Sequence, residues 1–272
     1  MIGYLTYCMN IVDIKIINND ILLSRLKALR LCKGLLLYTH TYKCNIIKID
    51  ICIVFDEVFV MGLILDIYEI MHQLSIWRPI FHSEADFQFS LAWMIKEQYP
   101  NCDIRLEFVP EFNPNLHLDI LVILDGKWIP IELKYTTRKC IKTINNEVYM
   151  LKEQGAKDQG CYNYLKDIMR IEEFRDKSNN FIEGYTIKIT SEISYLKPPT
   201  KVNCTYAEFS IEEGSIKTGC MNWSSNTGKG TMRGMEAPIV LTGIYPINWK
   251  EYSKVDDTNS GTFMYLVNRI SK

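Results

Sequence analysis

The sequence predicts a mixed α/β domain, and three observations support that prediction. The chain has 272 residues, of which 47% are hydrophobic and 23% charged, as in ordinary globular proteins. From about Met61 onwards, apolar residues recur either at helical spacing or in short runs typical of strands. The expected order is an opening helix, three strands, a long helix and a further strand. This order favours a mixed sheet flanked by helices.

Charge, cysteine usage and hydropathy narrow the classes of function. The 31 Lys and Arg residues balance 32 Asp and Glu residues, for a net charge of -1. This balance argues against wholesale electrostatic binding to nucleic acid but allows a local basic patch. Nine cysteines without a CxxC pair are typical of reduced thiols in a cytoplasmic protein. No run of 18 apolar residues and no signal-peptide pattern occurs, so we expect no membrane span.

Residues 1–60 differ from the rest of the chain and are rich in Ile, Leu, Asn and Lys. Short strands are expected at 14–17 and 45–51, and a helix at 21–37. Two hypotheses stay open: a small α/β appendage, or an upstream extension of a functional domain that spans 61–272. The second is motivated by the position of every informative motif beyond Met61.

From Met61 the expected elements follow one another closely. Ser83 has the features of an N-cap, because Glu84 and Asp86 follow it in the first turn of an apolar helical pattern. The expected helices are 63–76, 84–99, 146–174 (with an interruption near Gly155 or Gly160) and 262–270. The expected strands are 105–109, 118–124, 128–135, 182–193 and 238–245, and the expected loops are 197–199 and 222–234.

The most informative segment is the pair of apolar runs 118–124 and 128–135. Asp125-Gly126 lies between them, which is a strong signal for a two-residue hairpin. This turn pairs Leu124 with Lys127 and, counting back, places Asp119 opposite Glu132. Lys134 then shares their face of the hairpin by alternation.

Two opposed carboxylates on one face of a hairpin are unfavourable without a compensating cation. Lys134 supplies one positive charge, and a divalent metal would supply the rest. Hard oxygen donors suit Mg²⁺, or Mn²⁺ in its place, with the Leu133 carbonyl as a third protein ligand. Lys134 could then orient or help to deprotonate a metal-bound water, which makes a plausible centre for phosphodiester cleavage.

The alternative is a surface salt bridge at the end of the hairpin, with Asp119 and Glu132 sharing Lys134. Such clusters of perturbed charge are often structural. Here, however, the charged residues lie inside hydrophobic strands, where charges are seldom placed without a function. We therefore favour the functional interpretation.

Asp119 followed by Glu132-Leu133-Lys134 resembles the PD-(D/E)xK nuclease superfamily, which has the restriction-endonuclease-like fold. The resemblance covers roughly residues 63–245 in element order, although Leu118 replaces the proline of the motif. It implies that Asp119 and Glu132 are metal ligands and that Lys134 is the catalytic lysine. Family members have an opening helix, a hairpin that carries the motif, and a helix packed on the sheet.

The resemblance also suggests two supporting residues. The opening helix often supplies a further acidic ligand, and Glu84 matches that position best; a carboxylate that only complements the helix dipole is the alternative. Some subgroups have a glutamine on the helix after the motif, and Gln159 is the candidate. Asn163, Asp167 and Arg170 continue its helical face, and we expect that part of the face to be solvated.

The glycine-rich basic segment 227–234 is not a P-loop, because no GxxxxGK[ST] pattern occurs. It is either a loop that contacts nucleic-acid phosphates or a plain flexible loop.

The sequence as a whole predicts a Mg²⁺-dependent endonuclease that acts on DNA. The alternatives are a non-catalytic nucleic-acid- or partner-binding module that retains the fold, and a hydrolase of another phosphate ester. A homodimer that cuts both strands is one option for the oligomeric state.

Overall fold

The computed structural model describes residues 41–44, 47–50, 65–201, 204–258 and 260–272. The chain divides into two units, Met1–Asp66 and Ile67–Lys272. In the first unit, β1 (Thr41–Cys44) and β2 (Ile47–Asp50) form an antiparallel hairpin. β2 lies within the predicted strand at 45–51, whereas the predicted strand at 14–17 and helix at 21–37 lie outside the described residues.

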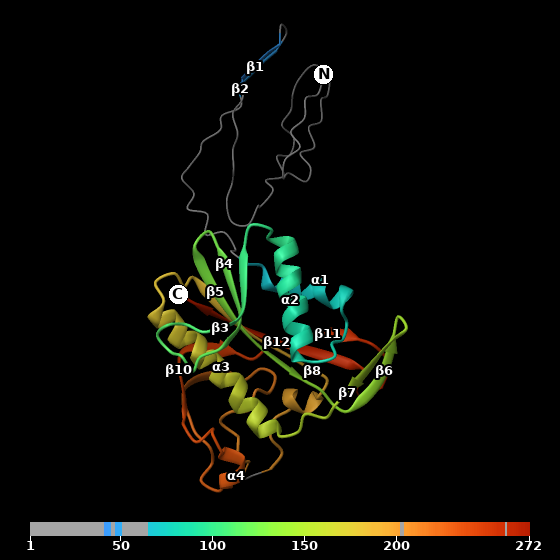
Figure 1. Cartoon of the computed structure of the whole chain (residues 1–272), viewed down its shortest axis with the longest axis vertical. Coiled ribbons are helices and arrows are strands. Elements are labelled where there is room, and N and C mark those ends of the chain that lie inside the picture. Colours follow the sequence, from blue (N-terminus) through green and yellow to red (C-terminus); the bar gives the residue numbers. More distant parts are fainter. Residues whose placement is uncertain (1–40, 45–46, 51–64, 202–203, 259) are drawn as a thin grey trace. The chain divides into compact units, whose positions relative to one another are not determined.

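The second unit is built on a six-stranded mixed sheet, in agreement with the predicted α/β class (Figure 1). Its strand order is β11-β12-β8-β5-β4-β3. β5 and β8 are parallel, and every other neighbouring pair is antiparallel. The strands are β3 (Asp103–Phe108), β4 (Leu118–Leu124), β5 (Lys127–Thr136), β8 (Glu183–Thr190), β11 (Trp249–Lys254) and β12 (Thr262–Ser271).

The β4–β5 hairpin has the predicted register, with Leu124 paired with Lys127. Asp125 and Gly126 both have positive φ, of 50° and 72°, which a tight turn between twisted strands requires. The paired residues of β4 and β5 end at Ile120 with Ile131, one position before Asp119 and Glu132. The two carboxylates therefore lie where the ladder between the strands stops.

Helices cover both faces of this hairpin. α2 (Glu84–Gln98) begins at the predicted N-cap, where the Ser83 side chain accepts a hydrogen bond from the Asp86 N–H. α3 (Lys157–Lys177) follows β5, and α1 (Ile67–Trp77) packs against α2 and β11. On β5, Tyr135 contacts Phe87 of α2, whereas Trp128 contacts Phe174 of α3. Because side chains alternate along a strand, α2 and α3 lie on opposite faces.

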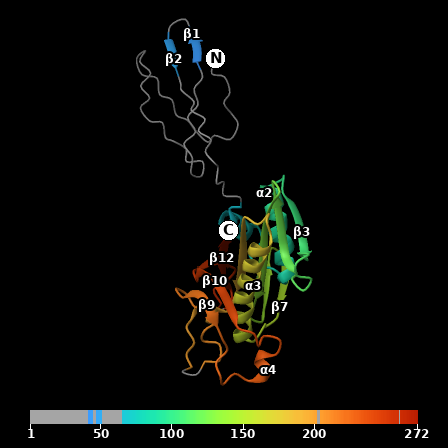
Figure 2. The ribbon, with the colours of Figure 1, turned by 90° about the vertical axis from the view of Figure 1, so that its left-hand side faces the viewer.

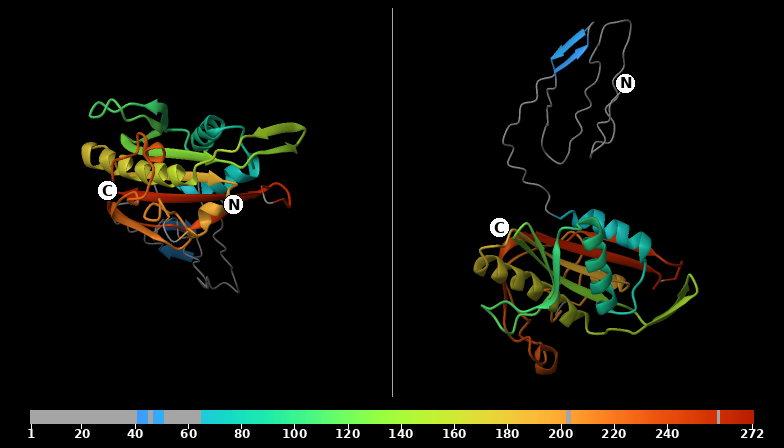
Figure 3. Two further views of the ribbon diagram at one scale, coloured as in Figure 1. Left: turned by 90° about the horizontal axis from the view of Figure 1, so that it is seen from below. Right: turned by 45° about the horizontal axis from the view of Figure 1, so that its top comes forward.

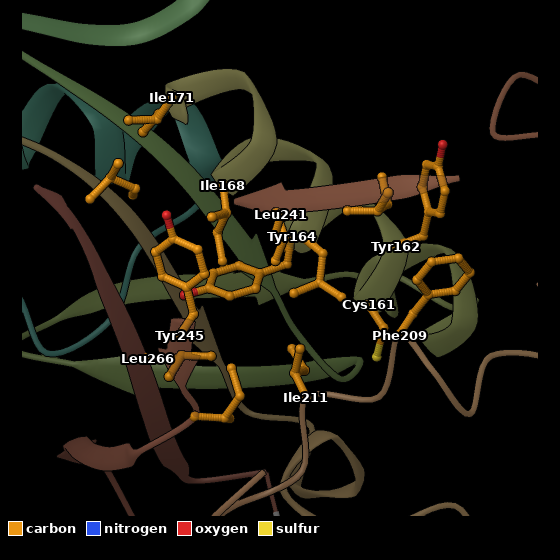
Figure 4. Close-up of a cluster of buried hydrophobic side chains, with 14 of the residues drawn as sticks. Cys161, Tyr162, Tyr164, Ile168, Ile171, Phe209, Ile211, Leu241, Tyr245 and Leu266 are labelled. Carbon is orange, nitrogen blue, oxygen red and sulfur yellow. The ribbon is translucent and has the colours of Figure 1, made fainter. Parts of the chain in front are cut away.

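A second, two-stranded sheet packs on α3. It consists of β9 (Ile216–Met221) and β10 (Ile239–Pro246), and Figure 2 shows it beside the helix. Tyr164, Ile168, Leu241 and Tyr245 form the apolar contact between α3 and β10, and all four are buried (Figure 4). This contact determines which face of α3 is directed towards the six-stranded sheet.

The predicted helix at 146–174 is wrong in its first third. Residues 140–151 form a hairpin of β6 (Cys140–Ile144) and β7 (Glu147–Leu151), which extends from the sheet as a separate arm (Figure 3). Asn145 and Asn146 have φ of 51° and 67°, so they make the tight turn. Asparagine tolerates this left-handed conformation, and an Asn-Asn pair was the overlooked turn signal.

The predicted closing helix at 262–270 is also wrong, because this segment is β12. It pairs with β8 along its length and with β11 on its other side. The middle of β12, from Tyr265 to Asn268, is buried, and a mostly apolar buried segment cannot be told from a helix by periodicity alone. Strands β9 and β11 were not predicted, and the loop at 222–234 contains the short helix α4 (Lys229–Met232).

Within the described residues, none of the helices has both the length and the apolar character that crossing a membrane demands. The cysteines described there as free thiols are Cys102, Cys140, Cys161, Cys204 and Cys220.

Candidate active site

Two acidic side chains from different elements bind the backbone of β5 on either side of Lys134. Asp119 of β4 accepts a hydrogen bond from the Leu133 N–H at 2.6 Å through Oδ2. Glu84, in the first turn of α2, accepts one from the Tyr135 N–H at 2.7 Å. The predicted residues Glu84, Asp119 and Lys134 are thereby brought together by the end of the hairpin and the start of α2.

Lys134 does not bridge Asp119 and Glu132 as the hairpin alone suggested. Its Nζ lies 2.9 Å from Oδ2 of Asp167 on α3 and donates to the Leu133 carbonyl at 2.8 Å. Asp167 is only 3% exposed, so the carboxylate of this ion pair is shielded from solvent, whereas the Lys134 side chain is 25% exposed. The assignment of the Leu133 carbonyl to a metal stays a prediction, since here that oxygen serves Lys134.

Glu132 is the most deeply buried acid of the group, at 1% exposure. Its Oε1 lies 3.3 Å from Nη2 of Arg170 on α3 and makes no hydrogen bond. Arg170 also pairs with Asp167 through Nη1 at 3.2 Å and donates to the His117 carbonyl. One guanidinium therefore serves three acceptors, and one oxygen of Glu132 is left incompletely satisfied.

The expectation that Asp167 and Arg170 lie on a solvated face is wrong. They point from α3 onto the sheet and pair with Lys134 and Glu132. The signal was present in the sequence, because both residues share a helical face with Gln159, already a candidate on other grounds. A lone polar face on a helix is often solvated, but here it covers charged residues of the neighbouring strand.

Burial and crowding of like charges shift the pKa values of the acids upward. Burial raises the pKa of Glu84 and of Asp119, although Lys134 opposes both shifts. Burial, reinforced by Asp167, raises the pKa of Glu132 well above its ordinary value of 4.5. The two basic side chains therefore do not fully compensate the negative charge.

The pKa of Lys134 is raised, although burial alone would lower it. Burial lowers the pKa of an ammonium group, but the carboxylates of Asp167, Glu84 and Asp119 outweigh it and raise the pKa. Lys134 is consequently a stable cation at neutral pH.

A cavity of about 270 Å³ opens beside this cluster, with Glu84 and Lys134 in its wall. Gln159 and Asn163 of α3 line it too, so the structure places the predicted Gln159 next to two of the predicted site residues. The side-chain amide of Gln159 donates to the Thr231 carbonyl at 2.9 Å, which ties the glycine-rich segment 227–234 to this end of α3.

Lys188 of β8 also lines the cavity and was missed in the sequence. In the parallel register it pairs with Lys134. The available signal was similar to the one that identified Lys134: a lysine between apolar residues of a strand, here Ile187 and Ile189.

The donor chemistry of the cluster fits a hard divalent cation. Asp119, Glu132 and Glu84 offer carboxylate oxygens, and the buried Oε1 of Glu132 lacks a hydrogen bond. In the part of the chain that the structure describes, no three acidic, histidine or cysteine side chains are arranged as a metal-binding group. Glu132 faces Arg170, so a cation there would compete with the guanidinium.

Comparison of the chain with protein-family models, with curated proteins and with solved structures found no match in any of the three.

Proposed function

We propose that this protein is a metal-dependent nuclease that hydrolyses phosphodiester bonds in DNA, of the PD-(D/E)xK type. The observation that supports it best is the group of buried and half-buried, incompletely compensated carboxylates around Lys134. Perturbed acids beside a buried cation and a cavity are typical of active sites. The element order α2-β3-β4-β5-α3-β8, with the β6–β7 hairpin between β5 and α3, also agrees with an opening helix, a motif-bearing hairpin and a helix packed on the sheet.

In this proposal, Asp119 and Glu132 hold Mg²⁺ and Glu84 assists from the start of α2. The ion supplies positive charge that activates water and stabilises the charge developing on the phosphate. Holding the ion requires Glu132 to exchange part of its contact with Arg170 for the metal.

Lys134 has a defined role that follows from its surroundings. Because its pKa is raised, it stays protonated and is better suited to orient the attacking water and stabilise negative charge than to remove a proton. Asp167, 2.9 Å from the ammonium, fixes its position. Asp167 is therefore a positioning residue in this account, and Arg170 holds both Asp167 and Glu132 in place.

A nucleic-acid substrate suits the surroundings of the cavity. Lys229 and Arg233 are exposed on the segment whose Thr231 carbonyl binds Gln159, so basic side chains lie on the loop joined to this end of α3. Local basic residues can contact phosphates even though the net charge of the whole chain is -1.

The test is cleavage of supercoiled plasmid and of single-stranded DNA by the full chain, in Mg²⁺, in Mn²⁺ and in EDTA. We expect nicking that needs the metal and is lost in Asp119→Asn and Lys134→Met. Two variants of the same hairpin are matched controls: Asp125→Asn in the turn and Lys127→Met at the start of β5, both at exposed positions. Both controls should cleave like wild type.

Other outcomes separate the remaining functions. DNA binding without cleavage, and indifference to Glu132→Gln, would point to the non-catalytic module. Hydrolysis of a nucleotide but not of DNA would point to a different phosphate ester. Cleavage that survives in EDTA or in Asp119→Asn would contradict the proposed site.

A further inference from the structure

Lys188 is a buried lysine without a carboxylate partner. It is 0% exposed, its Nζ donates to the Thr136 hydroxyl at 2.6 Å, and the ammonium lies 4.3 Å from the centre of the Tyr195 ring. Among the described residues no acidic group forms an ion pair with it. A buried ammonium in such surroundings costs free energy, and burial lowers its pKa to about 8. Packing alone gives no reason to keep this charge.

The cavity above Lys188 has the features of an anion site. Gly155 and Ala156 line it at the N-terminus of α3, where Ala156 makes no side-chain capping hydrogen bond. The N-terminus of a helix carries partial positive charge and unsatisfied N–H groups. Of the first-turn N–H groups, that of Gln159 is already bound by the Asp158 carboxylate.

The lining also includes two side-chain amides, of which that of Gln159 already donates to the Thr231 carbonyl. The side chains of Gln159 and Asn163 lie on the same helix face and also line the cavity. The one acidic side chain in the lining is Glu84, and its carboxylate accepts a hydrogen bond from the Tyr135 N–H. The volume of about 270 Å³ accommodates a group of several heavy atoms, at about 30 Å³ for a water molecule.

We propose that this cavity is a subsite for a backbone phosphate of the nucleic acid, with Lys188 as the buried positive charge beneath it. The inference rests on the proposed nuclease function and extends it. Lys188 is the cross-strand neighbour of Lys134 on adjacent parallel strands. A phosphate held here therefore lies next to the phosphodiester on which the cluster acts, and it positions the strand for cleavage.

The test is DNA binding by the full chain in EDTA, measured by fluorescence anisotropy at several salt concentrations. In Lys188→Met we expect the affinity to fall about tenfold, the effect of one lost charge-assisted contact. The slope of log K against log salt should shrink by about 0.7 to 0.9, the value for one phosphate contact. The melting temperature should stay the same or rise, because an apolar side chain replaces an unpaired buried charge.

Lys217→Met is the matched control. Lys217 is also buried, at 7% exposure, and burial also lowers its pKa, but it does not line the cavity. Lys217→Met removes the same charge as Lys188→Met, but at a position outside the cavity. It should therefore leave the salt slope unchanged. If Lys188→Met does not fold, Asn163→Ala replaces it, since Asn163 is partly exposed; a loss of about threefold in affinity is then expected.

The two proposals fail in different ways. If wild type binds and cleaves DNA but neither the affinity nor the slope changes in the cavity variant, the phosphate subsite is wrong and the nuclease stands. If the folded wild type binds no nucleic acid, both are wrong.

Discussion

Two buried glutamates in this domain have opposite surroundings. Glu172 on α3 is 3% exposed and accepts hydrogen bonds from the Thr242 N–H and hydroxyl, the Gly243 N–H and the Tyr245 hydroxyl, at 2.7 to 3.1 Å. Glu132 on β5 is 1% exposed, faces Arg170, and has an oxygen without a hydrogen bond. The two carboxylates are therefore buried to a similar extent but differ greatly in how many hydrogen bonds they accept.

The difference separates a structural acid from a candidate functional one. Glu172 joins α3 to β10, and its donors stabilise the charged form in place. Glu132 is held among other acids, so its negative charge is left partly uncompensated. A carboxylate that the protein alone leaves partly uncompensated can be compensated by a bound ligand.

The largest expected effect comes from neutralising the unsatisfied acid. Glu132→Gln should lower the rate of Mg²⁺-dependent nicking by about 10²- to 10⁴-fold, the usual range for a lost catalytic group. Its fold should be retained, because the change removes a poorly compensated charge. Initial rates at saturating DNA measure the effect. A Glu132→Gln variant as active as wild type would contradict the functional role assigned to Glu132.

The same substitution at the satisfied acid should act on stability. Glu172→Gln turns an acceptor into a donor in front of several donors, so the free energy of unfolding should fall by about 3 kcal/mol. Urea unfolding followed by circular dichroism measures it. The rate of nicking by the folded fraction should be unchanged, and a normal stability would show that these hydrogen bonds contribute little.

The pH dependence of stability sharpens the contrast. Because the pKa of Glu132 is raised on folding, the folded state binds its proton more tightly than the unfolded state does. In EDTA, the contribution of Glu132 to the free energy of unfolding is full below about pH 4.5, its ordinary pKa. The contribution is lost as the pH rises from there through the raised pKa, by about 1.4 kcal/mol for each pH unit. Urea unfolding of wild type and of Glu132→Gln across this pH range measures the difference. If the free energies of unfolding of the two proteins change with pH in parallel, the pKa of Glu132 is not raised.

The smallest expected effect is the coupling between Glu132 and Arg170. Arg170→Met should destabilise wild type at pH 8 more than it destabilises Glu132→Gln, because only wild type leaves a buried carboxylate without its counter-charge. We expect a coupling energy of about 1 kcal/mol, since the guanidinium is partly exposed and screened. A double-mutant cycle measures it. A coupling of zero would mean that the 3.3 Å contact has no energetic weight.

The core of the fold could be predicted where local chemistry decides it. The Asp125-Gly126 turn set the β4–β5 register, and Ser83 set the start of α2. The β6–β7 hairpin was missed because its only local signal is the Asn-Asn turn, and β12 was missed because a buried apolar strand has no distinctive periodicity. Which side chains meet depends on packing between distant elements, as for Lys134 and Asp167, 33 positions later on α3.

The most direct measurement is Mn²⁺ binding to the folded full chain, followed by electron paramagnetic resonance, in wild type, Glu132→Gln and Glu172→Gln. We expect wild type and Glu172→Gln to bind the ion alike and Glu132→Gln to bind it at least about tenfold more weakly. A folded wild type that binds neither Mn²⁺ nor competing Mg²⁺, or a Glu132→Gln variant that binds as well as wild type, would contradict it.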